Sequence, residues 1–422
     1  MKRVIIKIAK TVAVLVLLLA VTYGVLSVIG GRKYEAELQK LRAKGEPYTL
    51  VDLAGPPVPA CENGAVVYQK IFNRLGSPLG SKDPRGEVYL KLTFERQKLR
   101  LADWDEARRV AAKYEWVVPM VEKAVARPEC KFPVHWQDGA GVMFPHPARL
   151  RDLDRILSVK AIVYAHEGKA ESAVRCIRLA LQSANAVKDE PSLMSLLTRS
   201  AQLRIACYAL QEVLAETELS STQAKAVFDS LASMDLRPHC VLAAKGERGF
   251  GLIAFAQGRE QGLPKMLSYF DGAAYLRLMQ KQIDCAGVPY RIVKKHSSEE
   301  EQFRGVPKIY PFTRLMAAVF PRIPARVDSA TADFAGGQAA MALVAYNDKF
   351  GTYPATLDEA SAKLGWSIPA DPFTGRSLIY KRQGKGFLVY SIGANLKDDG
   401  GRRPPKNKSE REAGDIVWSL DR

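Results

Sequence analysis

The stretch RILSVKAIVYAHEGKAESAVRCIRLALQSANAV, 155–187, decides the helical character of this chain. Its apolar and small residues recur at the spacing of one helix face, and the pattern is interrupted only at Glu167-Gly168-Lys169. A glycine between two periodic segments is typical of a turn. The stretch therefore predicts two helices joined into a hairpin.

This hairpin resembles a tetratricopeptide unit, which is a pair of antiparallel helices. Small and aromatic residues stand where such a unit has them, at Ala161, Tyr164, Ala173 and Ala180. The following segment, 195–234, keeps the helical period without these marks. We expect two stacked helical hairpins, and not a long superhelical array, because no repeat continues for three or more units.

The N-terminal region predicts a membrane helix. No charged residue occurs between Lys10 and Arg32, and TVAVLVLLLAVTYGVLSVIGG can cross a hydrocarbon core of about 30 Å at about 1.5 Å per residue. A cleaved signal peptide has an apolar region of only about 7–15 residues and a small-residue cleavage site. The longer stretch here favours an uncleaved anchor.

The orientation of the anchor follows from weaker signals. Basic residues flank the span on both sides: Lys2, Arg3, Lys7 and Lys10 precede it, and Arg32, Lys33, Lys40, Arg42 and Lys44 follow it. Because the two sides nearly balance, the prediction rests on the usual behaviour of N-terminal signal anchors. We expect a single-pass protein of the inner (cytoplasmic) membrane, with a cytoplasmic N-terminus and the bulk of the chain extracytoplasmic.

Composition limits the function classes. The 422 residues carry a formal net charge of +17, which attracts anionic polymers and lipid head groups without specificity. The basic residues are spread along the chain, with no zinc finger or RNP-type strand, so we expect no nucleic-acid partner. The six cysteines include no CxxC pair, which argues against a zinc site, and Cys176 and Cys207 lie in apolar helical stretches that favour buried thiols.

These patterns predict four segments. Residues 1–31 form the transmembrane anchor, 32–64 a juxtamembrane helix with a proline-rich linker, 65–325 an α-helical domain, and 326–422 a small α+β module. The last boundary follows FPRIPARVDS, where Asp328 and Ser329 are expected to cap the next helix.

The C-terminal module is expected to pack one helix on a three-stranded antiparallel sheet. An alanine-rich helix ends at Gly351, and the turn sequence Asp371-Pro372-Phe373-Thr374-Gly375 introduces the strands SLIYK and GFLVYS. DIVWSL, 415–420, is the third strand. The predicted fold is thus mainly α after one transmembrane helix, with a small α+β end.

Ordered motifs in this module resemble the C-terminal half of the major pseudopilins of type II secretion systems. They are YNDKFGTYPATLDEA, IPADPFTG, SLIYK, FLVYSIGAN, DDGG and GDIVW, and the likeness covers 330–420. The whole chain is similar to uncharacterised single-pass, helix-rich membrane proteins of planctomycete-type bacteria, through LRAKGEPYTLVDLA and YSIGANLKDDGG. That second resemblance implies no function.

The pseudopilin resemblance implies a calcium site in the loop after the last long strand. The family's two acidic ligands fall on Asn395 and Asp415, and Asp398 and Asp399 could restore the charge that Asn395 lacks. Calcium takes 6–8 oxygen ligands in flexible geometry, which an acidic glycine-rich loop supplies. The basic insertion RRPPKNKSER, 402–411, opposes a cation, and the alternative is a loop held by its own backbone.

Two family features are missing, so we do not expect the chain to polymerise as a pilus subunit. The Gly-Phe-x-x-x-Glu processing motif is absent, and about 300 residues separate the anchor from the alanine-rich helix. The sequence favours a non-enzymatic protein that makes contacts with envelope proteins, associated with a secretion or envelope assembly. No small-molecule substrate is indicated.

The alternative is a hydrolase that acts on an envelope polymer through carboxylates. Asp103 with Asp105, or Glu247, are the candidates, although carboxylate spacing alone selects nothing. His166-Glu167 lacks the second histidine of a zinc-protease helix because position 170 is Ala. The remaining histidines stand alone in the sequence, and we expect structural roles for them.

Overall fold

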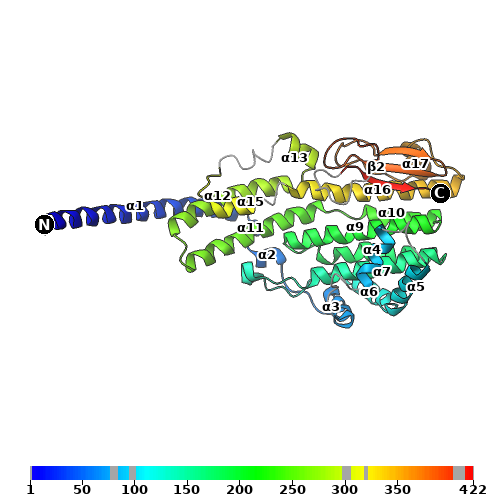
Figure 1. The fold of residues 1–422 in the computed structure, drawn as a ribbon, viewed down its shortest axis with the longest axis horizontal. Helices are drawn as coiled ribbons and strands as arrows, with labels where there is room; N and C mark the ends of the chain where they lie inside the picture. Colours follow the sequence, from blue (N-terminus) through cyan, green and yellow to red (C-terminus); the bar gives the residue numbers. More distant parts are fainter. Residues whose placement is uncertain are drawn as a thin grey trace.

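A computed structural model describes residues 2–76, 84–94, 101–296, 306–317, 322–402 and 414–421. The chain is mainly helical, with 70% of it in helices, a long apolar N-terminal helix and a three-stranded antiparallel sheet near the C-terminus. These coarse predictions are confirmed. Figure 1 shows an elongated molecule in which the first helix extends from one end and the sheet lies toward the other.

Helix α1, Lys2–Ala43, is one unbroken helix that is long and apolar enough to span a membrane. It does not stop after the apolar run. Its C-terminal part packs along α12, Lys265–Ala286, through Tyr34 and Leu41. The expected juxtamembrane helix is therefore the continuation of α1, and the proline-containing segment after it holds α2, Leu50–Ala54.

Short helices build the side of the body that lies away from α1. They are α3 (Gly64–Leu75), α4 (Pro84–Phe94), α5 (Leu101–Lys113), α6 (Val117–Val125) and the 3₁₀ helix η2 (Trp136–Gly141). Asn63 caps α3 by accepting from the backbone N–H of Ala65, as an N-cap side chain does. Asp103 lies in the first turn of α5.

The stretch 155–187 forms the predicted hairpin. Helix α7, His146–His166, turns at Glu167-Gly168-Lys169 into α8, Ala170–Ser183, and Gly168 has a φ of 73° that only glycine adopts freely. The 3₁₀ helix η3 (Ala184–Val187) follows, and α9 (Leu193–Glu216) packs on α7 and α8. Helix α10 (Ser221–Ala232) packs on α8 and on α16 (Ile323–Phe350) instead of along α9, so the second hairpin expected from 195–234 was predicted incorrectly. Cys176 and Cys207 are buried free thiols, as expected.

A second hairpin forms the end of the body from which α1 extends. It consists of α11, Arg237–Glu260, and α12, with α13 (Tyr290–His296) and α15 (Pro311–Ala317) after it. Glycines let α11 approach its neighbours: a Cβ on Gly246 would lie 1.8 Å from the Pro191 carbonyl oxygen, and one on Gly251 would lie 2.2 Å from the Tyr275 ring.

Helix α16, Ile323–Phe350, carries the C-terminal sheet and ends at Gly351 in the left-handed conformation, as predicted. The sheet has the order β1-β2-β3, with β1 Ile379–Gln383, β2 Gly386–Ser391 and β3 Ile416–Leu420, all antiparallel. Helix α17, Leu357–Leu364, packs beside α16. Figure 1 shows the strands lying along α16.

The start of α16 was predicted incorrectly. Pro324 occupies the first turn of the helix, where its missing N–H costs nothing, so α16 begins at Ile323 and the expected caps Asp328 and Ser329 lie inside it. Asp328 instead accepts from Arg237 at 2.8 Å and from the Tyr290 backbone N–H at 2.7 Å. The segment boundaries drawn from the sequence stay predictions.

Candidate functional site

The loop after β2 gathers the four residues predicted to bind calcium, but their oxygens accept hydrogen bonds. Asp415 is buried, and its two carboxylate oxygens accept from the backbone N–H groups of Asp399 at 3.3 Å and Gly401 at 2.6 Å. Asp398 accepts from the Tyr390 hydroxyl at 3.1 Å and from the Gly400 N–H at 2.8 Å.

The other two positions complete a hydrogen-bonded loop. The Asn395 side-chain amide donates to Asp399 at 2.8 Å, and its oxygen accepts from the Lys397 N–H at 2.9 Å. Burial raises the pKa of Asp415, with Asp398 and Asp399 adding to the effect and the backbone donors opposing it. A carboxylate that faces N–H donors stabilises a turn through its own backbone.

This arrangement does not fit a cation. Across the part of the chain that the structure describes, no group of three or more His, Cys, Asp or Glu side chains could hold a metal ion. Most of the basic insertion, 403–411, lies outside the described residues. Calcium binding stays a prediction, and the geometry assigns the four side chains to the internal hydrogen bonds of the loop.

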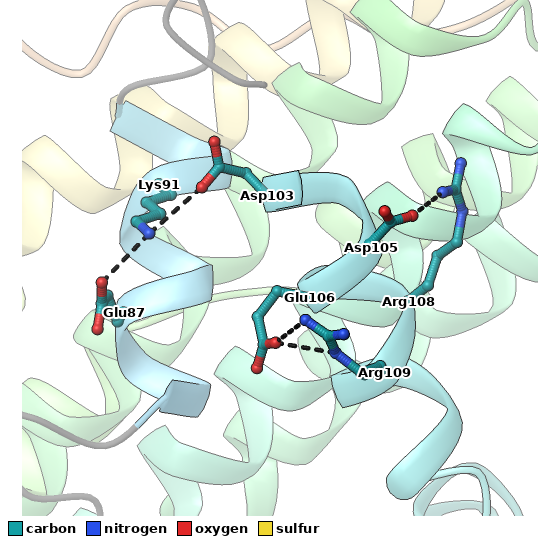
Figure 2. A network of polar contacts seen from close by, with 7 residues as sticks. All are labelled: Glu87, Lys91, Asp103, Asp105, Glu106, Arg108 and Arg109. Atoms are coloured by element: carbon teal, nitrogen blue, oxygen red, sulfur yellow. Dashed lines mark hydrogen bonds and ion pairs between the residues drawn. The ribbon is translucent and has the colours of Figure 1, made fainter. Parts of the chain in front are cut away.

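The carboxylates of the hydrolase alternative do not converge. Figure 2 shows Asp103 turned toward Lys91 of α4, at 3.3 Å, and Asp105 turned toward Arg108 of its own helix, at 2.9 Å. Their side chains are 11% and 62% exposed, because residues two apart on a helix point in different directions. Two carboxylates that flank one bond would need to face each other at about 5–9.5 Å.

Glu247 is half-buried on α11, within the helical body. Its carboxylate accepts from the backbone N–H of Leu193 at 3.0 Å, which holds the start of α9 against α11, and burial raises its pKa. The adjacent Arg248 donates to Gln280 at 3.2 Å. The two neighbours therefore contact different helices, and the position of Glu247 is that of a packing contact.

A buried polar cluster between α7 and α9 was not foreseen. Glu190 lies 2.9 Å from the Nε2 atom of His146 and accepts from the Ser195 hydroxyl, while its backbone oxygen lies 3.0 Å from His239. Burial, followed by the nearby Arg199, lowers the pKa of His239 to about 3. Since Ser195 is fully buried and faces Glu190, it is not placed as a nucleophile beside a histidine base. The two histidines lie 44 and 49 residues from Glu190 in the chain, so no spacing signal could reveal this cluster.

The contact between α1 and α12 is the feature that links the apolar span to the body. Gly30 lies against α12 so closely that a Cβ there would stand 3.1 Å from the Phe270 ring and 3.2 Å from the Tyr269 Cβ. Tyr34 and Leu41 continue the contact through Ala273 and Leu276. We call this contact, made by Gly30, Tyr34 and Leu41 with residues 269–276, the anchor dock.

Polar contacts surround the anchor dock. The Arg259 guanidinium lies 5.3 Å from the Tyr34 ring centroid and 5.1 Å from that of Tyr269, within the range of a cation–π interaction. Burial raises the pKa of Tyr34, and Arg259 opposes that effect. Glu37 on α1 pairs with Arg277 on α12 at 3.3 Å. The apolar part of α1 thus continues, within the same helix, into a part that packs against α12 of the body.

Comparison with known proteins adds no relative: no protein-family model, curated protein or solved structure matches the chain.

Proposed function

We propose that the chain is a membrane-anchored, non-enzymatic protein whose body makes contacts with other envelope proteins. The anchor dock carries this proposal. A helix that leaves the apolar span and continues without a break into a packed contact sets the position of the body relative to the bilayer. Gly30 lies at the end of the apolar run and inside the dock, so cleavage near the end of that run would remove part of the contact.

The proposed topology places the N-terminus in the cytoplasm and the body outside the cytoplasmic membrane, near a secretion or envelope assembly. The tetratricopeptide-like hairpins and the pseudopilin-like end supply the contact surfaces in this proposal. The edge strand β1 supports it, because Lys381, Arg382 and Gln383 are exposed there. Charged side chains on an exposed edge strand prevent unspecific pairing with strands of other proteins. In this proposal the module therefore remains available to a specific partner.

The hydrolase alternative gains no support from the described carboxylates. Asp103 and Asp105 pair with different cations, and Glu247 is committed to the Leu193 backbone. A reaction of this class needs two carboxyl groups on either side of one substrate bond.

Fractionation and cross-linking test the proposal in bacterial cells that express the full chain. An anchored protein stays in the membrane pellet after an alkaline wash, and protease added to spheroplasts digests the body. A photo-reactive residue in place of Ala362, which is exposed on α17, is expected to give a discrete light-dependent adduct with an envelope protein. Release of the chain by the wash would contradict the anchor, and the lack of any discrete adduct from this and other exposed positions would contradict the contact role.

A further inference from the structure

The body covers more of α1 than the apolar sequence suggests. Every residue of α1 from Arg3 to Val25 is exposed, and cover by the body begins at Leu26. The turn between α11 and α12 reaches still closer to the N-terminus, because the Lys265 backbone N–H donates to the Tyr23 hydroxyl at 3.0 Å. Figure 1 shows this turn beside α1, at the end of the body from which α1 extends.

The length of uncovered helix does not match a bilayer that begins at Lys10. From residue 11 to Val25 the helix is about 22 Å long, whereas a hydrocarbon core is about 30 Å thick. A span shorter than the core is accommodated by snorkelling of flanking lysines or by local thinning of the bilayer. With Lys10 at one surface of the bilayer, either response leaves the α11–α12 turn close to the head groups of the other surface.

The turn has the composition of a membrane interface. Leu263 is 39% exposed, and Pro264 and Lys265 beside it are also exposed. Tyr23 lies at the level of this turn, and tyrosine is enriched where hydrocarbon meets head groups.

Positive charge predominates around this turn. The turn 258–266 itself contains Arg259 and Lys265, against one acidic residue, Glu260. The ammonium group of Lys33 lies 5.2 Å from the Phe270 ring centroid, which holds it beside the turn. Basic residues near an anionic membrane surface are attracted to it.

We propose that the α11–α12 turn, residues 258–266, sits in the head-group layer of the bilayer and binds anionic lipid head groups. Leu263 enters the boundary between head groups and acyl chains, and Lys265 contacts the head-group phosphates. The body is thereby attached to the membrane at two places, through the span and through this turn. This inference rests on the membrane anchoring proposed above.

Depth-dependent quenching tests the proposal on the full chain in vesicles of phosphatidylglycerol and phosphatidylcholine. A fluorophore on a Leu263→Cys thiol is expected to lose emission when lipids with a head-group quencher are included. The same fluorophore on an Ala362→Cys thiol, in exposed α17 far from α1, is expected to keep its emission. The parent chain, treated with the same fluorophore, is the control for labelling of the native thiols, of which Cys61 is exposed.

A charge reversal tests the lipid preference. Lys265→Glu, or vesicles of phosphatidylcholine alone, is expected to reduce the quenching at position 263. Lys385→Glu changes the net charge equally in the exposed β1–β2 turn and is expected to leave the quenching unchanged. Equal reduction by both variants would contradict the assignment of Lys265.

The two proposals fail in distinguishable ways. A chain that an alkaline wash removes from the vesicles contradicts the membrane anchor, and with it the position of the α11–α12 turn in the head-group layer. If the chain stays in the vesicles but the fluorophore at position 263 is quenched no more than the one at position 362, the head-group position of the turn is contradicted and the anchor is not.

Discussion

The two longest helices, α1 and α16, are both rich in small and apolar residues, yet the protein surrounds them differently. Helix α16 is buried along nearly its whole length between the helical body and the sheet. Helix α1 is covered only in its C-terminal part, and its residues from Arg3 to Val25 are exposed. The uncovered part of α1 is long and apolar enough to span a membrane or to act as a signal sequence, whereas α16 is a core helix of the protein.

Glycine serves close packing in both helices. Gly336 and Gly337 let α16 approach Trp418, where added Cβ atoms would stand 2.5 and 3.1 Å from the indole ring. Gly30 plays the same part against Phe270, whereas a Cβ on Gly24 of the same helix would meet nothing within 4 Å. The difference between Gly24 and Gly30 thus marks where α1 leaves the body.

The largest effect is expected at α16. Trp418→Ala removes the fully buried ring that joins the sheet to this helix, and we expect a loss of about 3–5 kcal/mol in the free energy of unfolding. Chemical denaturation of the full chain in detergent measures it. Met143→Ala, at an exposed side chain, is the control, and a similar small loss in both variants would contradict a core role for Trp418.

A pH effect is expected in the hairpin core next to α16. Burial raises the pKa of Asp154 to about 7, and the Ser183 hydroxyl that donates to it opposes the rise. Because the fold favours the protonated acid, stability is highest below about pH 4 and is lost as the pH rises to about 7. Between about pH 4 and pH 7 this loss in the free energy of unfolding is on the order of 2–4 kcal/mol, and Asp154→Asn is expected to abolish it. If the free energy of unfolding of Asp154→Asn depended on pH as steeply as that of the parent chain, the role of Asp154 would be contradicted.

The anchor dock gives a smaller effect with a close control. Gly30→Leu forces a side chain against Phe270 and is expected to weaken the dock by about 1–3 kcal/mol. Faster hydrogen exchange of the α12 amides around Tyr269 measures this loss. Gly24→Leu adds the same side chain at an open position, and equal exchange in both variants would show that α1 does not pack on α12.

The loop after β2 gives the smallest effect. Asp415→Asn replaces one of the two acceptors that face the Asp399 and Gly401 N–H groups, and we expect a loss of about 1 kcal/mol. Asp421→Asn, at an exposed position, is the control. Since the oxygens already accept hydrogen bonds, added calcium is expected to leave the melting temperature unchanged, and a clear rise on calcium addition would instead support the cation site that the family resemblance implies.

Local signals predicted the elements that depend on neighbouring residues. The uninterrupted apolar run predicted α1, Gly168 marked the α7–α8 turn, and Gly351 marked the end of α16. The strands SLIYK and GFLVYS, predicted from their own residues, pair as β1 and β2. In each case the residues that determine the structure lie within a few positions of one another.

Contacts between distant segments could not be predicted in this way. Tyr23 and Lys265 are 242 residues apart, and nothing in either segment indicates the other. The loop carboxylates were expected to face a cation because acidic side chains next to glycines suit calcium. Their direction was decided by the backbone N–H groups that the loop itself presents, which sequence spacing does not show.

The most direct test of the anchor combines an alkaline wash of the membranes with a measurement of the intact mass of the protein. Membranes from cells that express the full chain are washed at alkaline pH, the pellet is dissolved in detergent, and the intact mass of the protein is measured. The account predicts a pelleted protein that retains α1 through Gly30. A soluble protein, or a chain shortened by the loss of the apolar run, would contradict it.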